Sequence, residues 1–144
     1  MNDEKETLDD ENKITLAEQE FINYCEANEF DHDEIAMDED DRVNFVKIKN
    51  RFMKAINEKR LVVDGTKLEY TVSNFSKTAG EKIIISRPRG RDFIAMDGFK
   101  DTQEMQKFNA FLASLAGKDK SYVANLDIKD KQFLQDIGIL FTHA

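Results

Sequence analysis

The dipeptide Asp64-Gly65 constrains the fold of this chain more than any other feature of its sequence. It stands inside the stretch LVVDGTKLEYTVS, between two runs that are rich in β-forming residues. An Asp-Gly pair in such a setting is the strongest short-range signal for a β-hairpin, because glycine readily adopts the positive φ angles of tight hairpin turns. We therefore predict two antiparallel strands, over residues 61–63 and 67–72.

A third apolar run, EKIIISRP, follows a polar loop that ends at Gly80. Its three consecutive isoleucines, residues 83–85, are typical of a strand that is covered on both faces or lies at the centre of a small sheet. Pro88 is the only proline, and we expect it to end this strand and to suit the first turn of a helix, because it lacks an amide hydrogen and has a fixed φ. Gly90 is expected to relieve crowding at the same corner. The sequence thus predicts a three-stranded antiparallel sheet.

Two helical segments precede this sheet. Thr15 is the predicted N-cap of a helix over about 16–28, with Glu18 three positions further on. One face of that helix is formed by Leu16, Phe21, Ile22 and Cys25. The longest predicted helix, 40–59, has acidic residues at its first turn, basic residues near its end, and apolar residues spaced by three and four.

Two further helical segments follow the sheet. The first ends at Gly117 and has Asp101 or Thr102 as its expected cap. Its apolar stripe comprises Met105, Phe108, Phe111, Leu112 and Leu115. Asp127 is the expected cap of the last helix, whose stripe comprises Phe133, Leu134, Ile137, Leu140 and Phe141.

These elements predict an α+β fold with an N-terminal helical pair, a small three-stranded antiparallel sheet and a helical C-terminal half. A length of 144 residues is that of one ordinary domain. We predict a disordered acidic tail over 1–13 and a single domain over 14–144, in which 14–60 form a helical arm and 61–144 the sheet and C-terminal helices. No apolar run approaches the roughly 18 residues that span a bilayer, and the chain opens with MNDEKETLDDEN in place of a hydrophobic leader, so we expect a cytosolic protein without a membrane partner.

The charges are divided unevenly along the chain. Residues 1–41 hold 17 acidic and 2 basic side chains, whereas residues 42–144 hold 12 acidic and 19 basic ones. Such an acidic arm can keep the protein soluble, bind a basic partner, or lie on the protein's own body and screen it.

Residue types that carry catalysis or bind metals form no recognisable set. Cys25 stands at an apolar helix position, and together with His32 and His143 it lacks the spacing of zinc ligands. Asp31 and Asp33 begin like a calcium loop, but the oxygen ligand and the glycine that such a loop needs further on are missing. No glycine-rich phosphate loop is present in the sequence. We therefore predict a protein that is not an enzyme and has no catalytic, metal-binding or cofactor-binding residues.

The stretch SRPRGRDF holds the candidate partner-binding residues Arg87, Arg89, Arg91 and Phe93. Three arginines in one corner can clamp phosphates, but aromatic residues do not alternate with basic ones around them and the net charge of the chain is −8. An acidic patch on a protein partner, or the acidic arm of the same chain, is the better counter-charge. A small nucleic-acid-linked or protein-binding regulator that uses this corner is our alternative function.

The order of features over residues 61–141 resembles the tail assembly chaperones of long-tailed bacteriophages and prophages. In that family a strand runs into an Arg-Pro-x-Gly turn, which here is Arg87-Pro88-Arg89-Gly90. A helix with a Leu-x-x-Leu-Ala-Gly ending follows, here Leu112-Ala113-Ser114-Leu115-Ala116-Gly117, and then a final helix that begins with Leu126-Asp127-Ile128-Lys129-Asp130. Two features depart from the pattern: Arg89 replaces a small hydroxylic residue, and the helical N-terminal segment is long.

The resemblance implies a non-enzymatic chaperone that keeps the aggregation-prone tape-measure protein in solution and helps tail-tube subunits to polymerise around it. It also implies that the protein acts in the host cytoplasm and is absent from the mature virion. The partners would be the tape-measure protein and the tail-tube subunit, and the sequence leaves self-association open.

Overall fold

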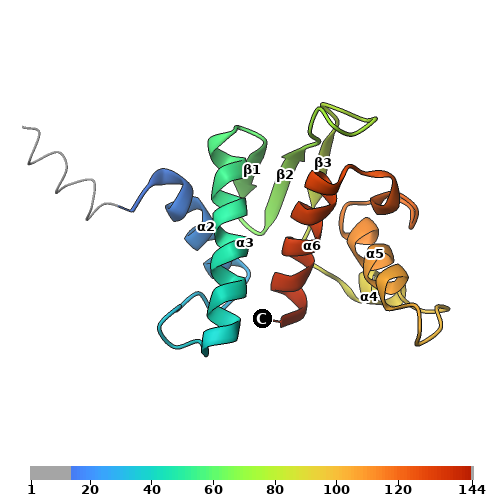
Figure 1. Ribbon diagram of the computed structural model, residues 1–144, viewed down its shortest axis with the longest axis horizontal. Helices are drawn as coiled ribbons and strands as arrows, with labels where there is room; N and C mark the ends of the chain where they lie inside the picture. The colour runs from blue at the N-terminus through green and yellow to red at the C-terminus, as the bar shows by residue number, and fades with distance from the viewer. Residues whose placement is uncertain (1–13, 144) are drawn as a thin grey trace, which may run out of the picture.

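The computed structural model describes residues 14–143, so the predicted tail over 1–13 lies outside the described residues (Figure 1). Two helices come first, α2 (Leu16–Ala27) and α3 (Glu39–Asn57). The sheet follows, with β1 (Leu61–Asp64), β2 (Lys67–Thr71) and β3 (Lys82–Ile85). The C-terminal half holds α4 (Gly90–Ile94), α5 (Glu104–Leu115), the short 3-10 helix η1 (Val123–Asn125) and α6 (Ile128–His143). This order confirms the predicted α+β fold.

The β-hairpin forms where Asp64-Gly65 predicts it, with the turn shifted by one residue. Strand β1 extends to Asp64, which pairs with Lys67, so the two loop residues are Gly65 and Thr66. Gly65 has a φ of 60°. Thr66 is not among the non-glycine residues with positive φ, and a positive φ at the first loop position alone is the pattern of a type II′ turn, whose twist matches that of the flanking strands.

The sheet has the order β1-β2-β3 with antiparallel pairing throughout, and its two faces differ sharply. Its inner face is made of Leu61, Val63, Leu68, Tyr70, Ile83 and Ile85, which are buried or half-buried. The interpretation of residues 83–85 as a central or doubly covered strand is wrong, because β3 is an edge strand and Ile84 is 46% exposed. Alternation of side chains along a strand places Ile84 on the outer face, in one row with Val62 and Glu69.

Helix α2 belongs to the main core although it lies in the acid-rich part of the sequence. Thr15 caps it as predicted, since its hydroxyl accepts a hydrogen bond from the Glu18 amide at 3.1 Å. Leu16 was expected on the buried face but is 76% exposed, and Ala17 is buried instead. The residues of α2 that are in the core cluster are Phe21, Tyr24 and Cys25.

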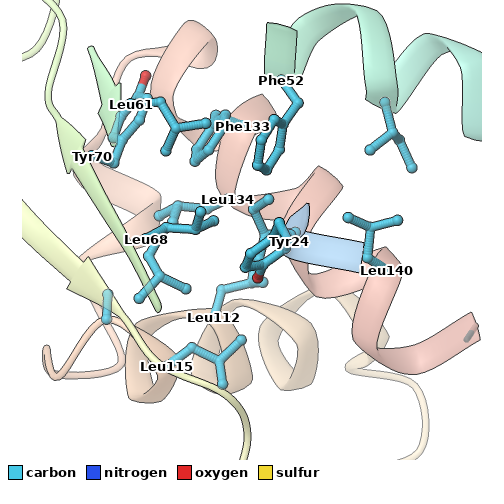
Figure 2. Packing of buried hydrophobic residues seen from close by; sticks show 14 of the residues in the cluster. Tyr24, Phe52, Leu61, Leu68, Tyr70, Leu112, Leu115, Phe133, Leu134 and Leu140 are labelled. Carbon is cyan, nitrogen blue, oxygen red and sulfur yellow. The ribbon is translucent and has the colours of Figure 1, made fainter. Parts of the chain in front are cut away.

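The core lies between the inner face of the sheet and the helices. Figure 2 shows Leu61, Leu68 and Tyr70 of the sheet directed towards Phe133 and Leu134 of α6. The rings of Tyr70 and Phe133 stack with their centroids 4.3 Å apart. Aromatic pairs of this kind add packing energy to the area that they bury.

The connections of the C-terminal half agree only partly with the sequence predictions. Pro88 precedes the N-cap residue of α4, Arg89, so it stands before the helix and not in its first turn. A Cβ atom added at Gly90 would meet nothing within 4 Å, so Gly90 does not relieve crowding there. Helix α5 is preceded by Gln103, so neither of the expected caps, Asp101 and Thr102, is its N-cap residue.

Most other expectations for α5 and α6 hold. Glycine ends α5 as predicted, because Gly117 has a φ of 68° and the next amide bonds back to the Ala113 carbonyl. Met105 is exposed, but Phe111, Leu112 and Leu115 of the predicted stripe are buried. The stripe of α6 is buried or half-buried as predicted. Within residues 14–143, no helix has the length and apolar character needed to cross a membrane.

Candidate functional site

The arginine corner does not form a single cluster of free cations. The Arg87 guanidinium donates hydrogen bonds to the carbonyl oxygen of Asn28 at 2.7 Å and to its side-chain oxygen at 3.2 Å. Asn28 is buried and is the C-cap residue of α2, whose last carbonyls attract a positive charge. Arg87 therefore ties the exit of β3 to the end of α2, and its counterpart in the acidic arm is a helix terminus and not a carboxylate.

The other predicted residues of this corner lie on and beside α4. The Arg89 amide donates to Asp92 Oδ2 at 2.7 Å, and the Ser114 hydroxyl donates to Asp92 Oδ1 at 2.5 Å. The side chains of Arg89 and Arg91 are exposed and make no hydrogen bond or ion pair with the described residues. Phe93 is 45% exposed, and its ring packs on that of Phe111 at a centroid distance of 5.0 Å. Buried Asp92 is thus the centre of this corner.

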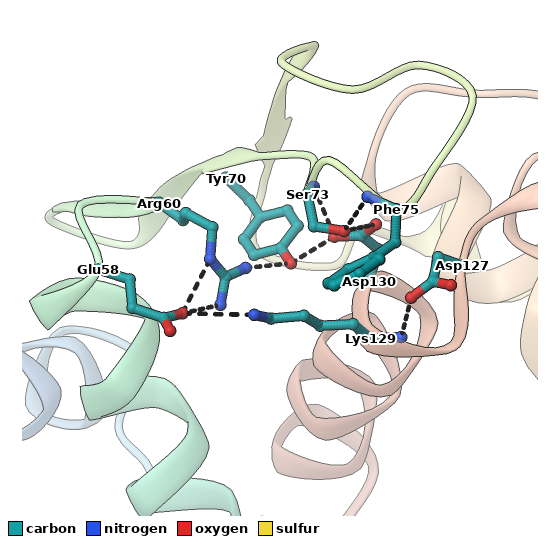
Figure 3. A network of polar contacts seen from close by, with 8 residues as sticks. All are labelled: Glu58, Arg60, Tyr70, Ser73, Phe75, Asp127, Lys129 and Asp130. Carbon is teal, nitrogen blue, oxygen red and sulfur yellow. Dashed lines mark hydrogen bonds and ion pairs between the residues drawn. The ribbon is translucent and has the colours of Figure 1, made fainter.

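A second polar centre joins the sheet to the start of α6 (Figure 3). Asp130 is fully buried and accepts four hydrogen bonds, from the Tyr70 hydroxyl at 2.6 Å, the Ser76 hydroxyl at 2.6 Å, and the Ser73 hydroxyl and amide at 2.8 and 2.9 Å. Burial raises the pKa of Asp130, but the hydrogen bonds from Ser76, Tyr70 and Ser73 outweigh it and bring the pKa below its usual value. A buried carboxylate with this many donors is held as an anion.

The network continues from Tyr70 to the end of α3. The Arg60 guanidinium donates to the Tyr70 hydroxyl at 2.7 Å and to Glu58 Oε1 at 2.6 Å. Lys129 lies 3.6 Å from the same oxygen of Glu58 (Figure 3). These contacts link the C-terminal end of α3 to the N-terminal end of α6, and thereby help to set the relative position of the two helices.

A trough lies between α3 and α6, which run side by side in Figure 1. Its larger part, here called the wide end, has a volume of about 650 Å³. The floor of the wide end is apolar and is formed by Phe30, Met37, Phe45, Ile48, Ile139 and Leu140. Charged and polar side chains form its rim, as in grooves that take the apolar face of a helix.

A bidentate ion pair bridges the two helices within the trough. Arg51 Nε lies 2.6 Å from Asp136 Oδ2, and Arg51 Nη2 lies 2.9 Å from Asp136 Oδ1. Gln132 also donates to Asp136, at 3.2 Å. Arg51 and Gln132 line the wide end and also a second hollow of about 360 Å³, here called the narrow end, which Lys54, Arg60 and Lys129 surround. Because the two hollows share Arg51 and Gln132, they lie end to end along α3 and α6, and together they are called the α3–α6 trough.

Sequence reasoning missed this trough, although α3 carried a signal for it. Asn44, Lys47, Arg51 and Lys54 recur at spacings of three and four and so follow one line along the helix, beside the apolar stripe. The partner of Arg51, Asp136, is 85 residues away in the sequence. The pairing of α3 with α6 could therefore not be inferred from local pattern.

Cys25, Asp31 and Asp33 have structural surroundings. Cys25 is buried, and burial raises the pKa of its thiol to about 12, so the nucleophilic thiolate is suppressed. The carboxylates of Asp31 and Asp33 accept hydrogen bonds from amides two residues ahead, which stabilises the turn before α3. In the part of the chain that the structure describes, no three potential ligands gather at one point to hold a metal ion.

Comparison with known proteins finds no matching family model, curated protein or solved structure.

Proposed function

We propose that this protein is a chaperone of bacteriophage tail assembly, without enzymatic activity, that binds the tape-measure protein and supports assembly of the tail tube in the host cytoplasm. The observation that carries the proposal is the α3–α6 trough, with its apolar floor and charged rim. Tape-measure proteins of the resembled family are long amphipathic helices, and a trough between two helices can shelter the apolar face of such a client.

The arrangement of the buried polar groups supports a binding function in preference to a catalytic one. Asp130 and Asp136 are both saturated by donors from their own chain and help to fix α3, α6 and the sheet relative to each other. A preformed groove lowers the entropic cost of binding, because little has to be ordered when the client docks. Arg87 is engaged with Asn28, which removes one of the three cations on which the alternative function depends.

Co-expression with the tape-measure protein of the same phage or prophage tests the proposal. We expect more soluble tape-measure protein and its co-purification with the chaperone. Substitution Asn44→Trp places a large side chain in the trough from an exposed position of α3, so it should abolish co-purification without disturbing the core. Asn50→Trp is the matched control, since Asn50 is exposed on the same helix and does not line the trough.

Two results would contradict the proposal. One is a tape-measure protein whose solubility is unchanged by the chaperone. The other is retention of the client by Asn44→Trp at the level of Asn50→Trp, which would place the client elsewhere. A gene for a tail-tube protein before this gene and a very long helical gene after it would support the proposal independently.

A further inference from the structure

We infer that the α3–α6 trough has a direction: it takes a single partner helix with its acidic end at the narrow end of the trough and its basic end at the wide end. The inference rests on the proposed function, because it specifies how a client helix lies in the same trough. It is carried by the charges of the two ends and by the course of α3 between them.

The narrow end has an excess of positive charge. Lys54, Arg60 and Lys129 line it, and Glu58 is the acidic group that pairs with the last two. Lys54 is exposed and makes no hydrogen bond or ion pair with a described residue. Ile128 is exposed at the rim and Phe133 lies in the floor, so a ligand there meets both cations and apolar surface.

The wide end has the opposite balance. Two acidic residues, Asp31 and Asp41, and one basic residue, Lys47, line it. Arg51 and Asp136 also line it but neutralise each other. Glu39 and Asp40 stand beside Asp41 in the first turn of α3 and strengthen the negative charge. A basic segment of a partner is therefore favoured at this end, and an acidic one is repelled.

The charge pattern also sets the direction of the partner helix. Helix α3 runs from Asp41 at the wide end to Lys54 at the narrow end, which is about 20 Å at 1.5 Å per residue. Helices usually carry acids in their first turn and bases in their last, as α3 does, because these charges complement the helix dipole. A client helix of this ordinary pattern must run antiparallel to α3 to place its acids beside Lys54.

Shape and charge favour a single helix over other occupants. A second copy docked through the same trough about a two-fold axis would present an equally concave surface, and two concave surfaces do not fit together. A nucleic acid would bring its negative charge against Asp31 and Asp41, which repel it. An amphipathic helix satisfies the floor and both charged ends at once.

Synthetic helical peptides of about 20 residues provide the test. The charged peptide has leucines along one face, glutamates in its first turn, lysines in its last turn and a nitroxide label at its N-terminus. The neutral peptide has the same leucines and glutamine in place of every charge. Affinities are measured for the wild type, for Lys54→Glu and Asp41→Lys, and for Lys100→Glu, which makes the same charge change as Lys54→Glu at an exposed residue outside the trough.

We expect Lys54→Glu to weaken binding of the charged peptide about three- to tenfold, because an attractive surface pair becomes a repulsive one. Asp41→Lys should weaken it by a similar factor, and both effects should shrink at high salt. Binding of the neutral peptide should be unchanged, as should binding of either peptide to Lys100→Glu. The nitroxide should broaden the amide signals around Lys54 more strongly than those around Asp41.

Equal affinities of Lys54→Glu and Lys100→Glu for the charged peptide would overturn the inference, and so would stronger broadening around Asp41 than around Lys54. If the neutral peptide still binds the trough in that case, the proposed function stands and only the direction is wrong. If neither peptide and no tape-measure segment binds, the proposed function itself fails. A dimer that forms through this face and is dissociated by Asn44→Trp would also contradict the inference.

Discussion

Replacing Asp130 by alanine should damage this protein more than replacing any other carboxylate at the start of α6. The side chain is fully buried and accepts hydrogen bonds from Tyr70, Ser73 and Ser76. Asp130→Ala would leave three hydroxyls and one amide without their acceptor in a space that an alanine methyl group cannot fill. The substitution therefore removes the hydrogen bonds from β2 and the loop after it to Asp130 of α6.

The expected loss of stability follows from this geometry. A hydrogen bond to a charged group contributes about 1.5–3 kcal/mol, and four of them end on Asp130, but the serine and tyrosine hydroxyls can partly find new partners. Loss of one member of a buried charged network typically costs about 3–5 kcal/mol, and we expect a value in that range. Since domains are stable by about 5–15 kcal/mol, this is a large share of the total.

Urea unfolding followed by circular dichroism measures the loss, and Asp127→Ala is the matched control. Asp127 lies three residues earlier and caps α6 through a hydrogen bond from the Lys129 amide at 2.9 Å. Loss of a helix cap costs about 1 kcal/mol. If Asp130→Ala were no more destabilising than Asp127→Ala, the network around Asp130 would not have the role that we assign to it.

Three further predictions concern pH, packing and the arginine corner. The pKa of Asp130 is lower in the folded state than in the unfolded state. The contribution of its carboxylate to the free energy of unfolding should therefore be complete above the unfolded pKa of about 4 and be lost as the pH falls through the folded pKa. Urea midpoints of the wild type and Asp130→Asn, measured between pH 7 and 2, should converge as the pH falls. Gly138→Ala should destabilise the protein by about 1–3 kcal/mol in thermal unfolding, because the new Cβ would lie 2.4 Å from Leu112 Cδ2 in the packed core. Gly90→Ala is the control: its Cβ meets no atom within 4 Å, so it should be neutral or slightly stabilising. Arg87→Ala should cost about 1–2 kcal/mol in the same assay by freeing the end of α2, and a loss no greater than that of Arg91→Ala would contradict the role of Arg87 as a link within the chain.

The elements of the fold could be predicted because each has a local cause. Gly65 supplies a positive φ at the hairpin, Thr15 and Asp127 cap their helices, and Gly117 ends α5. The position of β3 could not be predicted in this way. Three isoleucines in a row look the same in a central strand and in an edge strand whose outer face holds one exposed isoleucine, so the outcome depends on which strand the tertiary fold places in the middle.

The candidate site could be predicted even less, because long-range contacts create it. Asp130 belongs to a segment singled out by family resemblance, but its donors Tyr70, Ser73 and Ser76 are 54 to 60 residues away. The charge of the SRPRGRDF stretch predicts Arg87 as a partner-binding residue, and only the fold brings Asn28 to it. The sequence likewise does not distinguish the acidic segment from a free arm, because only the fold places its side chains Phe21, Tyr24 and Cys25 in the core.

The acid-rich segment contributes side chains to the core. Deletion of residues 1–41 would remove Phe21 and Tyr24 from the core and unfold the protein. Deletion of residues 1–13 removes acidic residues and keeps every described helix and strand. We expect this shorter deletion to keep the unfolding midpoint within a few degrees of the wild type. Client binding at several salt concentrations can then be compared between the deletion variant and the wild type.

Methyl NMR of the isotope-labelled protein, titrated with a helical segment of the tape-measure protein, tests the central claim most directly. The methyl groups of Met37, Ile48 and Ile139 line the trough, whereas Val62 and Ile84 lie on the open outer face of the sheet. We expect the trough methyl signals to shift with the client and those of the outer face to stay in place. Shifts confined to Val62 and Ile84 would show that the client binds the sheet and that the α3–α6 trough is not its site.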